Sequence, residues 1–199
     1  IEFHGAKAQA RNGAGIRLEG GGRLTVRDSG FFDNENGILS GDGGSVGIGR
    51  SEFARNGYGD GQSHNLYIGF AESLTVRASY FHEARIGHNL KSRARLNHIE
   101  NSYFMDGPGG TSSYLVDFPS GGTVYLRGNL FQKGPKADNS NAIAFGQEGL
   151  RKWSENTLEM VHNTVVMTRS GGGFIVANAA TQSVKLTANI FAGTGSPSL

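Results

Sequence analysis

The sequence contains no cysteine, few prolines (4) and no long apolar run. Without cysteine there is no disulfide framework, so stability must come from a hydrophobic core and from backbone hydrogen bonds. No stretch approaches the roughly 20 apolar residues of a membrane span, and we expect none. The scarcity of proline and the lack of a three-residue glycine period exclude a collagen-like chain.

Charge of either sign is also modest, with 19 Lys and Arg against 17 Asp and Glu and a formal net charge of +2. A nucleic-acid-binding protein needs a denser basic stripe, so we expect no nucleic-acid partner. The small positive excess is compatible with an anionic partner of another kind.

Glycine, in contrast, is abundant, at 32 of 199 residues. Because each glycine inside a helix costs about 1 kcal/mol relative to alanine, this abundance argues against a helical protein. It favours many short strands joined by turns. The length corresponds to one domain with a substantial core.

An internal repeat is the strongest signal in the sequence. One block recurs: an apolar-x-apolar pair, two further residues, a Ser or Asn, one residue, and usually a Phe. The seven copies begin at Leu24, Val46, Leu74, Asn97, Val124, Leu158 and Val184. A second apolar block precedes each copy, centred on Ile16, Ile38, Leu66, Leu90, Leu115, Ile143 and Ile175. In the coil of Ile143, about six extra residues, roughly 149–154, are expected to bulge out as a loop.

The intervals between copies vary from 22 to 34 residues, which indicates fixed strands joined by loops of variable length. Such short strands become stable when equivalent strands of successive coils stack about 4.8 Å apart. We therefore predict an all-β fold, a single-stranded right-handed parallel β-helix of about seven coils. The Phe column should fill its interior and the Ser/Asn column should form an inward corner. Residues 1–199 are expected to be one domain, truncated at both ends, of a longer protein.

Alternation along the strands predicts which side chains face outward. Leu66, Ile68, Leu90, Ser92, Leu115 and Asp117 are expected to face the core. Asn65, Tyr67, Gly69, Asn89, Lys91, Arg93, Tyr114, Val116 and Phe118 are expected to face outward. The outward set stacks Asn65, Asn89 and Tyr114 in one column and Tyr67 with Lys91 in another, with His64 and His88 at the edge. This is where His, Lys, Arg and Tyr converge, and it is the candidate site.

The repeat, together with the stretches HNLYIG, GHNLKSRA and SYLVDFPSGGT, resembles bacterial right-handed β-helix proteins of the pectate-lyase-like superfamily. The resemblance implies a secreted carbohydrate-active protein, located extracellularly, in the periplasm or at the cell surface. It implies an acidic polysaccharide as partner, and most directly a polysaccharide lyase. The oligomeric state is left open.

A lyase on a uronate-containing chain needs a group that neutralises the carboxylate, a base for the C5 proton and an acid for the leaving oxygen. The hypothesis assigns Arg93, helped by Arg95, to the carboxylate, Lys91 as base, and Tyr67 or His88 as acid. Further substrate contacts are expected from Asn65, Asn89, Tyr114 and Trp153.

The segment KSRARLNHIENSYF resembles the region around the catalytic lysine of the chondroitinase B and alginate lyase family. On that resemblance Lys91 is the base. The family places an arginine about one coil later, whereas residues 111–118 contain none. Its calcium ligands have no clear counterpart here, so calcium stays a possible cofactor without an assigned ligand set.

Three alternatives remain. The same face can serve a non-catalytic polysaccharide-binding module, a surface scaffold or an adhesin. Lys91 and Arg93 can be an ordinary solvated face, with His64 and His88 bonding turn backbone. A Lys91 that is buried and paired with Asp117 would be a structural ion pair rather than a catalyst. For an inward Asp117, we expect Ser92 and the Gly121–Gly122 amides as partners.

Overall fold

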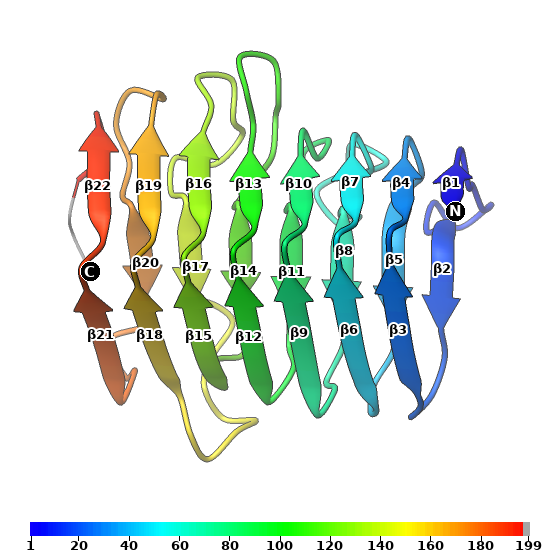
Figure 1. Cartoon of the computed structure of the whole chain (residues 1–199), viewed down its shortest axis with the longest axis horizontal. Helices are drawn as coiled ribbons and strands as arrows, with labels where there is room; N and C mark the ends of the chain where they lie inside the picture. Colours follow the sequence, from blue (N-terminus) through cyan, green and yellow to red (C-terminus); the bar gives the residue numbers. More distant parts are fainter. Residues whose placement is uncertain (197–199) are drawn as a thin grey trace.

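The computed structural model describes residues 1–196, and these form a parallel β-helix. Each coil contributes one short strand to each of three parallel sheets, so neighbouring strands of a sheet come from successive coils (Figure 1). In the described residues there is no helix, and hence none that is long and apolar enough to cross a membrane. The predicted fold class, an all-β parallel β-helix of about seven coils, is confirmed.

The three sheets are named A, B and C. Sheet A consists of β1 (Glu2–His4), β4 (Gly30–Phe32), β7 (Glu52–Ala54), β10 (Tyr80–His82), β13 (Tyr103–Met105), β16 (Leu130–Lys133), β19 (Thr164–Met167) and β22 (Ile190–Gly193). Sheet B consists of β2 (Ala14–Leu18), β5 (Asn36–Ser40), β8 (Leu66–Ile68), β11 (Leu90–Ser92), β14 (Val116–Phe118), β17 (Ile143–Phe145) and β20 (Ile175–Ala177). Sheet C consists of β3 (Arg23–Arg27), β6 (Ser45–Gly49), β9 (Ser73–Arg77), β12 (Leu96–Glu100), β15 (Thr123–Arg127), β18 (Thr157–Val161) and β21 (Ser183–Thr187).

The predicted phenylalanine column runs through the interior behind sheet A. From Phe3 to Phe131, successive rings stack nearly parallel, with centroids 4.5 to 5.2 Å apart. Val165 and Phe191 continue the column in register. Parallel strands superpose equivalent side chains, so one recurring sequence position becomes one continuous interior stack.

The corner between sheets C and A carries the predicted Ser/Asn column. The backbone N–H of each member donates to the side-chain oxygen of the next coil's member, as from Ser51 to Ser79 (3.2 Å) and from Ser102 to Asn129 (3.0 Å). Just before this column the chain takes a positive φ, even at Ala78 (48°). A left-handed alanine costs on the order of 1 kcal/mol, so the ladder helps to hold the turn.

The long coil also behaves as predicted. Residues 146–156, between β17 and β18, contain no strand and leave the stack as a loop (yellow in Figure 1). We call this segment the 146–156 loop. It begins where β17 ends, so it lies on the outer side of sheet B, next to the candidate site.

Candidate functional site

The outer face of sheet B brings three polar side chains into one row. The register aligns Tyr67 of β8 with Lys91 of β11 and Lys91 with Asp117 of β14. In β8 and β11 the flanking residues are buried, so the middle residue of each three-residue strand points away from the core. The predicted neighbours Tyr67 and Lys91 are therefore adjacent.

The predicted register of β14 is wrong by one residue. Val116, and not Leu115, pairs with Leu90, so Val116 and Phe118 fill the core and Asp117 lies in the outer row. Leu115 is itself fully buried. Two consecutive buried apolar residues leave the alternation ambiguous, and a slip of one residue reverses every assignment in the strand. The nearest polar partners of Asp117 are Lys91 and His88 rather than the predicted Ser92 and Gly121–Gly122.

Lys91 points away from the core but is not solvent-facing, contrary to the prediction. Its side chain is 12% exposed, with Nζ 2.8 Å from Glu148 Oε1 and 3.6 Å from Asp117 Oδ2. Glu148 belongs to the 146–156 loop, which folds back over the row. The contacts of Lys91 therefore match the alternative in which this residue is paired with Asp117. An ammonium held between two carboxylates is a poor proton acceptor.

Arg93 is the most fully engaged side chain of the site. Its Nε donates to Tyr67 Oη (3.1 Å), its Nη1 donates to Ser120 Oγ (3.0 Å), and its Nη2 pairs with Glu148 Oε2. Together with Lys91 it holds both oxygens of one carboxylate. These contacts raise the pKa of Arg93 against the opposing effect of burial, so the guanidinium is a fixed cation.

Asp117 is the least satisfied group of the site. Its side chain is 4% exposed, and its Oδ1 has no hydrogen-bond partner in the described structure. Burial raises the pKa of Asp117 to about 7, with Lys91 opposing the shift and Glu148 adding to it. A buried carboxyl that has one oxygen without a hydrogen bond and a pKa near neutrality is typical of a functional site.

His64, His88 and Tyr114 form a column of stacked rings beside this row, with centroids 4.8 and 5.2 Å apart. The shared column of the two histidines was predicted; Tyr114 belongs to it and not to the asparagine column. Each Nδ1 accepts a backbone N–H of the next coil, from His88 and from Tyr114 respectively. The Nε2 of His88 lies 3.4 Å from Asp117 Oδ2.

Burial lowers the pKa of both histidines, that of His64 to about 3, so both rings are neutral at physiological pH. The turn-bonding alternative therefore describes His64. His88 bonds the turn backbone through one nitrogen and faces Asp117 with the other.

Asn65 and Asn89 are fully buried, so the prediction that they face outward is wrong. They continue an interior asparagine ladder from Asn34 and Asn56, in which Asn56 Nδ2 donates to Asn65 Oδ1 (2.8 Å) and Asn65 Nδ2 to Asn89 Oδ1 (2.7 Å). A row of amides that bond one another satisfies most of the groups that a core otherwise rejects, while Asn89 Nδ2 has no hydrogen-bond partner in the described structure. Both residues lie out of reach of a polysaccharide.

Arg95 and Trp153 lie at the margin of the site. Arg95 is exposed and pairs with Glu72 (3.2 Å) instead of joining Arg93. Trp153 was predicted to contact the substrate, but its side chain is partly covered. Its Nε1 donates to the Arg93 carbonyl (3.2 Å) and its ring meets the edge of Phe70. It fastens the loop to the site.

Two functional candidates were missed or misplaced by sequence reasoning. Asp117 was assigned to the core through the register error. No pattern in the sequence indicated that Glu148 belongs to the site, since its contact with Lys91 spans 57 residues of sequence. A loop this long at the edge of a basic patch was the one available hint.

The described residues contain no group of three or more His, Cys, Asp or Glu side chains arranged to hold a metal ion.

Comparisons with known proteins add no relative. A scan against family models, a search of curated proteins and a search of solved structures each find no match to this chain.

Proposed function

We propose that this chain is a secreted, carbohydrate-active member of the pectate-lyase-like superfamily, and that it cleaves a uronate-containing polysaccharide by β-elimination. One observation carries the proposal: Lys91 and Arg93 already hold a carboxylate, that of Glu148, beside the unsatisfied carboxyl of Asp117. The acidic character of the substrate follows from this pair of cations.

In the proposed reaction, the substrate carboxylate takes the place of the Glu148 carboxylate on Lys91 and Arg93. The two cations then stabilise the negative charge that develops when the neighbouring C5–H bond breaks. The proposal requires that displacement of Glu148 also gives the substrate access to Asp117, whose side chain is 4% exposed in the structure.

Asp117 replaces Lys91 as the proposed base. A carboxyl with a pKa near 7 is half ionised near neutral pH, where a general base works best. It takes the C5 proton, the C4–O bond breaks, and a C4–C5 double bond forms. Tyr67, whose hydroxyl is held by Arg93, gives a proton to the leaving oxygen. His88 is proposed to position Asp117, since Nε2 faces its carboxylate.

The test is the ultraviolet absorbance of unsaturated uronates, measured with alginate, pectate, chondroitin and glucuronan as substrates. We expect turnover on one of them, a loss of at least about 100-fold in kcat for Asp117→Asn, and a comparable loss for Arg93→Ala. Tyr67→Phe should lower kcat with little change in KM. Absence of turnover on all four substrates, or full activity of Asp117→Asn, would contradict the mechanism.

Glu148→Gln should weaken the competition for the two cations and lower KM for the acidic substrate severalfold. Glu155→Gln is the matched control, because Glu155 lies in the same loop and contacts Thr123 instead of the basic pair. Equal KM values for the two variants would show that Glu148 does not occupy the substrate's place.

The second candidate function is non-catalytic binding of the same polysaccharide. The contacts of Lys91 and Arg93 with the Glu148 carboxylate support it, because holding a carboxylate is all that binding requires. Retained binding in a pull-down without product formation, abolished by Arg93→Ala, would support this function over the lyase.

A further inference from the structure

The outer face of sheet A carries a groove, separate from the site on sheet B. It has a volume of about 830 Å³ and crosses the strands from β1 to β16. Its floor is the row of outward residues at the first position of each strand, with aromatic and aliphatic side chains toward β13 and β16. Carboxylates lie toward β1 and β7. The proposed function uses none of these residues.

Two tyrosines form the apolar half of the groove. Tyr80 and Tyr103 are paired positions of adjacent strands, and their rings stand at 89° with centroids 6.3 Å apart. The ring of Tyr80 lies flat on His82, 4.2 Å away, which fixes its orientation. Tyr103 is 52% exposed. Two rings at a right angle make a corner in which a saturated ring can lie against one face and touch the other.

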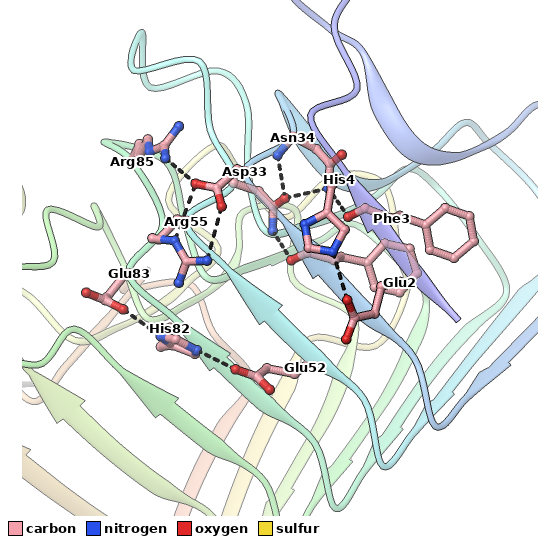
Figure 2. Close-up of polar contacts among 12 residues, drawn as sticks. Glu2, Phe3, His4, Asp33, Asn34, Glu52, Arg55, His82, Glu83 and Arg85 are labelled. Carbon is pink, nitrogen blue, oxygen red and sulfur yellow. Dashed lines mark hydrogen bonds and ion pairs between the residues drawn. The ribbon is translucent and has the colours of Figure 1, made fainter.

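The other half of the groove is acidic. Glu52 is the paired neighbour of Tyr80 on the opposite side from Tyr103. Figure 2 shows His82 pointing between Glu52 and Glu83, with its two nitrogens 3.0 and 2.8 Å from their oxygens. His82 thereby holds the Glu52 carboxylate in place, while 47% of that side chain remains exposed.

The charged side chains that line the groove indicate which class of ligand it favours. The side chains that line the groove include three carboxylates, Glu2, Asp28 and Glu52, and one guanidinium, Arg50, which is already paired with Asp28 (2.7 Å). Figure 2 shows a different balance nearby, where two guanidiniums, those of Arg55 and Arg85, pair with the single carboxylate of Asp33. A polyanion is repelled by this lining. A cation beside the exposed ring of Tyr103 and the half-buried ring of Tyr80 gains both ion pairing and cation–π attraction.

We propose that the sheet A groove binds an oligosaccharide whose sugars carry free amino groups. A pyranose ring stacks in the corner of Tyr80 and Tyr103, and its ammonium pairs with Glu52. The apolar ring faces of a sugar fit the tyrosines, and the open groove accommodates a chain that continues toward Met105 and Leu130.

The test is calorimetric titration of the full chain with glucosamine oligosaccharides at mildly acidic pH, where the sugar amine is protonated. We expect binding that weakens with salt, and a loss of roughly tenfold in affinity for Tyr103→Ala and for Glu52→Gln. Tyr125→Ala is the matched control, because Tyr125 lies on the outer face of sheet C, stacked on His98. Its affinity should be unchanged.

Three further ligands decide the chemistry. N-acetylglucosamine oligosaccharides, oligogalacturonate and oligolysine should each bind at least about tenfold more weakly than the glucosamine chain. Equal binding of the N-acetylated or acidic chain would overturn the role of Glu52. Tighter binding of oligolysine would assign the groove to a basic peptide instead. No glucosamine binding, or binding unaffected by both substitutions, overturns the proposal. Arg93 variants leave this assay unchanged, so it fails or succeeds independently of the lyase.

Discussion

At the scale of single residues, two buried carboxylates of this protein differ in how they are satisfied. Asp106 accepts hydrogen bonds at both oxygens, from Ser112 Oγ and from the Gly134 N–H, and faces the buried ammonium of Lys133 (3.6 Å). Asp117 faces Lys91 at the same distance but has one oxygen without a partner. Full satisfaction is what a structural ion pair requires, and incomplete satisfaction is what a binding site leaves open.

This difference predicts opposite effects of the same substitution. Because the folded-state pKa of Asp117 is raised to about 7, the folded protein binds more protons than the unfolded chain between about pH 4 and 7. Stability from this group is therefore lost as pH rises through that window. Asp117→Asn removes this dependence of stability on pH. The free energy of unfolding of the variant minus that of the parent should therefore increase by about 2–4 kcal/mol between pH 4 and 8.

Urea unfolding at a series of pH values measures the effect. Asp106→Asn is the control, and it should destabilise the protein at every pH because it weakens a fully bonded buried pair. A parent and an Asp117→Asn variant with parallel pH profiles would show that Asp117 is ionised throughout.

At the scale of elements, the strands are too short to be stable alone, and what holds them is the column that each position forms with its neighbours. Phe104 is fully buried between Phe81 and Phe131. Phe3, at the edge of the column, is in ring contact with Phe31 and is only partly buried.

Phe104→Ala should therefore destabilise by about 3–5 kcal/mol, since it leaves a cavity between two rings that cannot close onto each other. Phe3→Ala should destabilise by less than half of that amount. Chemical denaturation of both variants provides the comparison. A similar loss in the two would mean that the column is not the source of the stability.

At the scale of the whole molecule, each coil contacts its neighbours along one axis, and the two ends differ from the middle. Val76, in the middle of sheet C, is fully buried, whereas the equivalent Leu186 of β21 is 39% exposed. In such a stack stability is the sum of coil and interface contributions, so within residues 1–196 the first and last coils have one stabilising interface fewer than the coils between them.

Amide hydrogen exchange should therefore be slowest in β9, β12 and β15 and faster toward β3 and β21. Exchange in the end coils should proceed by local opening, about tenfold or more faster than global unfolding allows. Uniform protection along the stack would indicate one cooperative unit instead.

Much of the architecture was predictable from the repeat. In a parallel stack, one recurring sequence position becomes one column in space, so aligned Phe, Ser and Asn positions predicted the core and the corner directly. The prediction failed at Leu115 and Val116, where two adjacent buried residues concealed the alternation and misplaced Asp117. It failed also at Asn65 and Asn89, because the sequence at the edge of a strand does not distinguish an asparagine that bonds solvent from one that joins an interior ladder of amides.

Periodicity alone was enough to predict the coils, the outward direction of Tyr67, Lys91 and Arg93, and the shared column of His64 and His88. The contacts of Glu148 with Lys91 and Arg93, and the burial of Asp117 beside them, became visible in the folded chain. A loop has no period, because its path depends on which side chains it meets when it folds back. The same holds for the groove on sheet A, where Glu52, Tyr80 and Tyr103 come from three coils and gain a common role only when the strands are stacked.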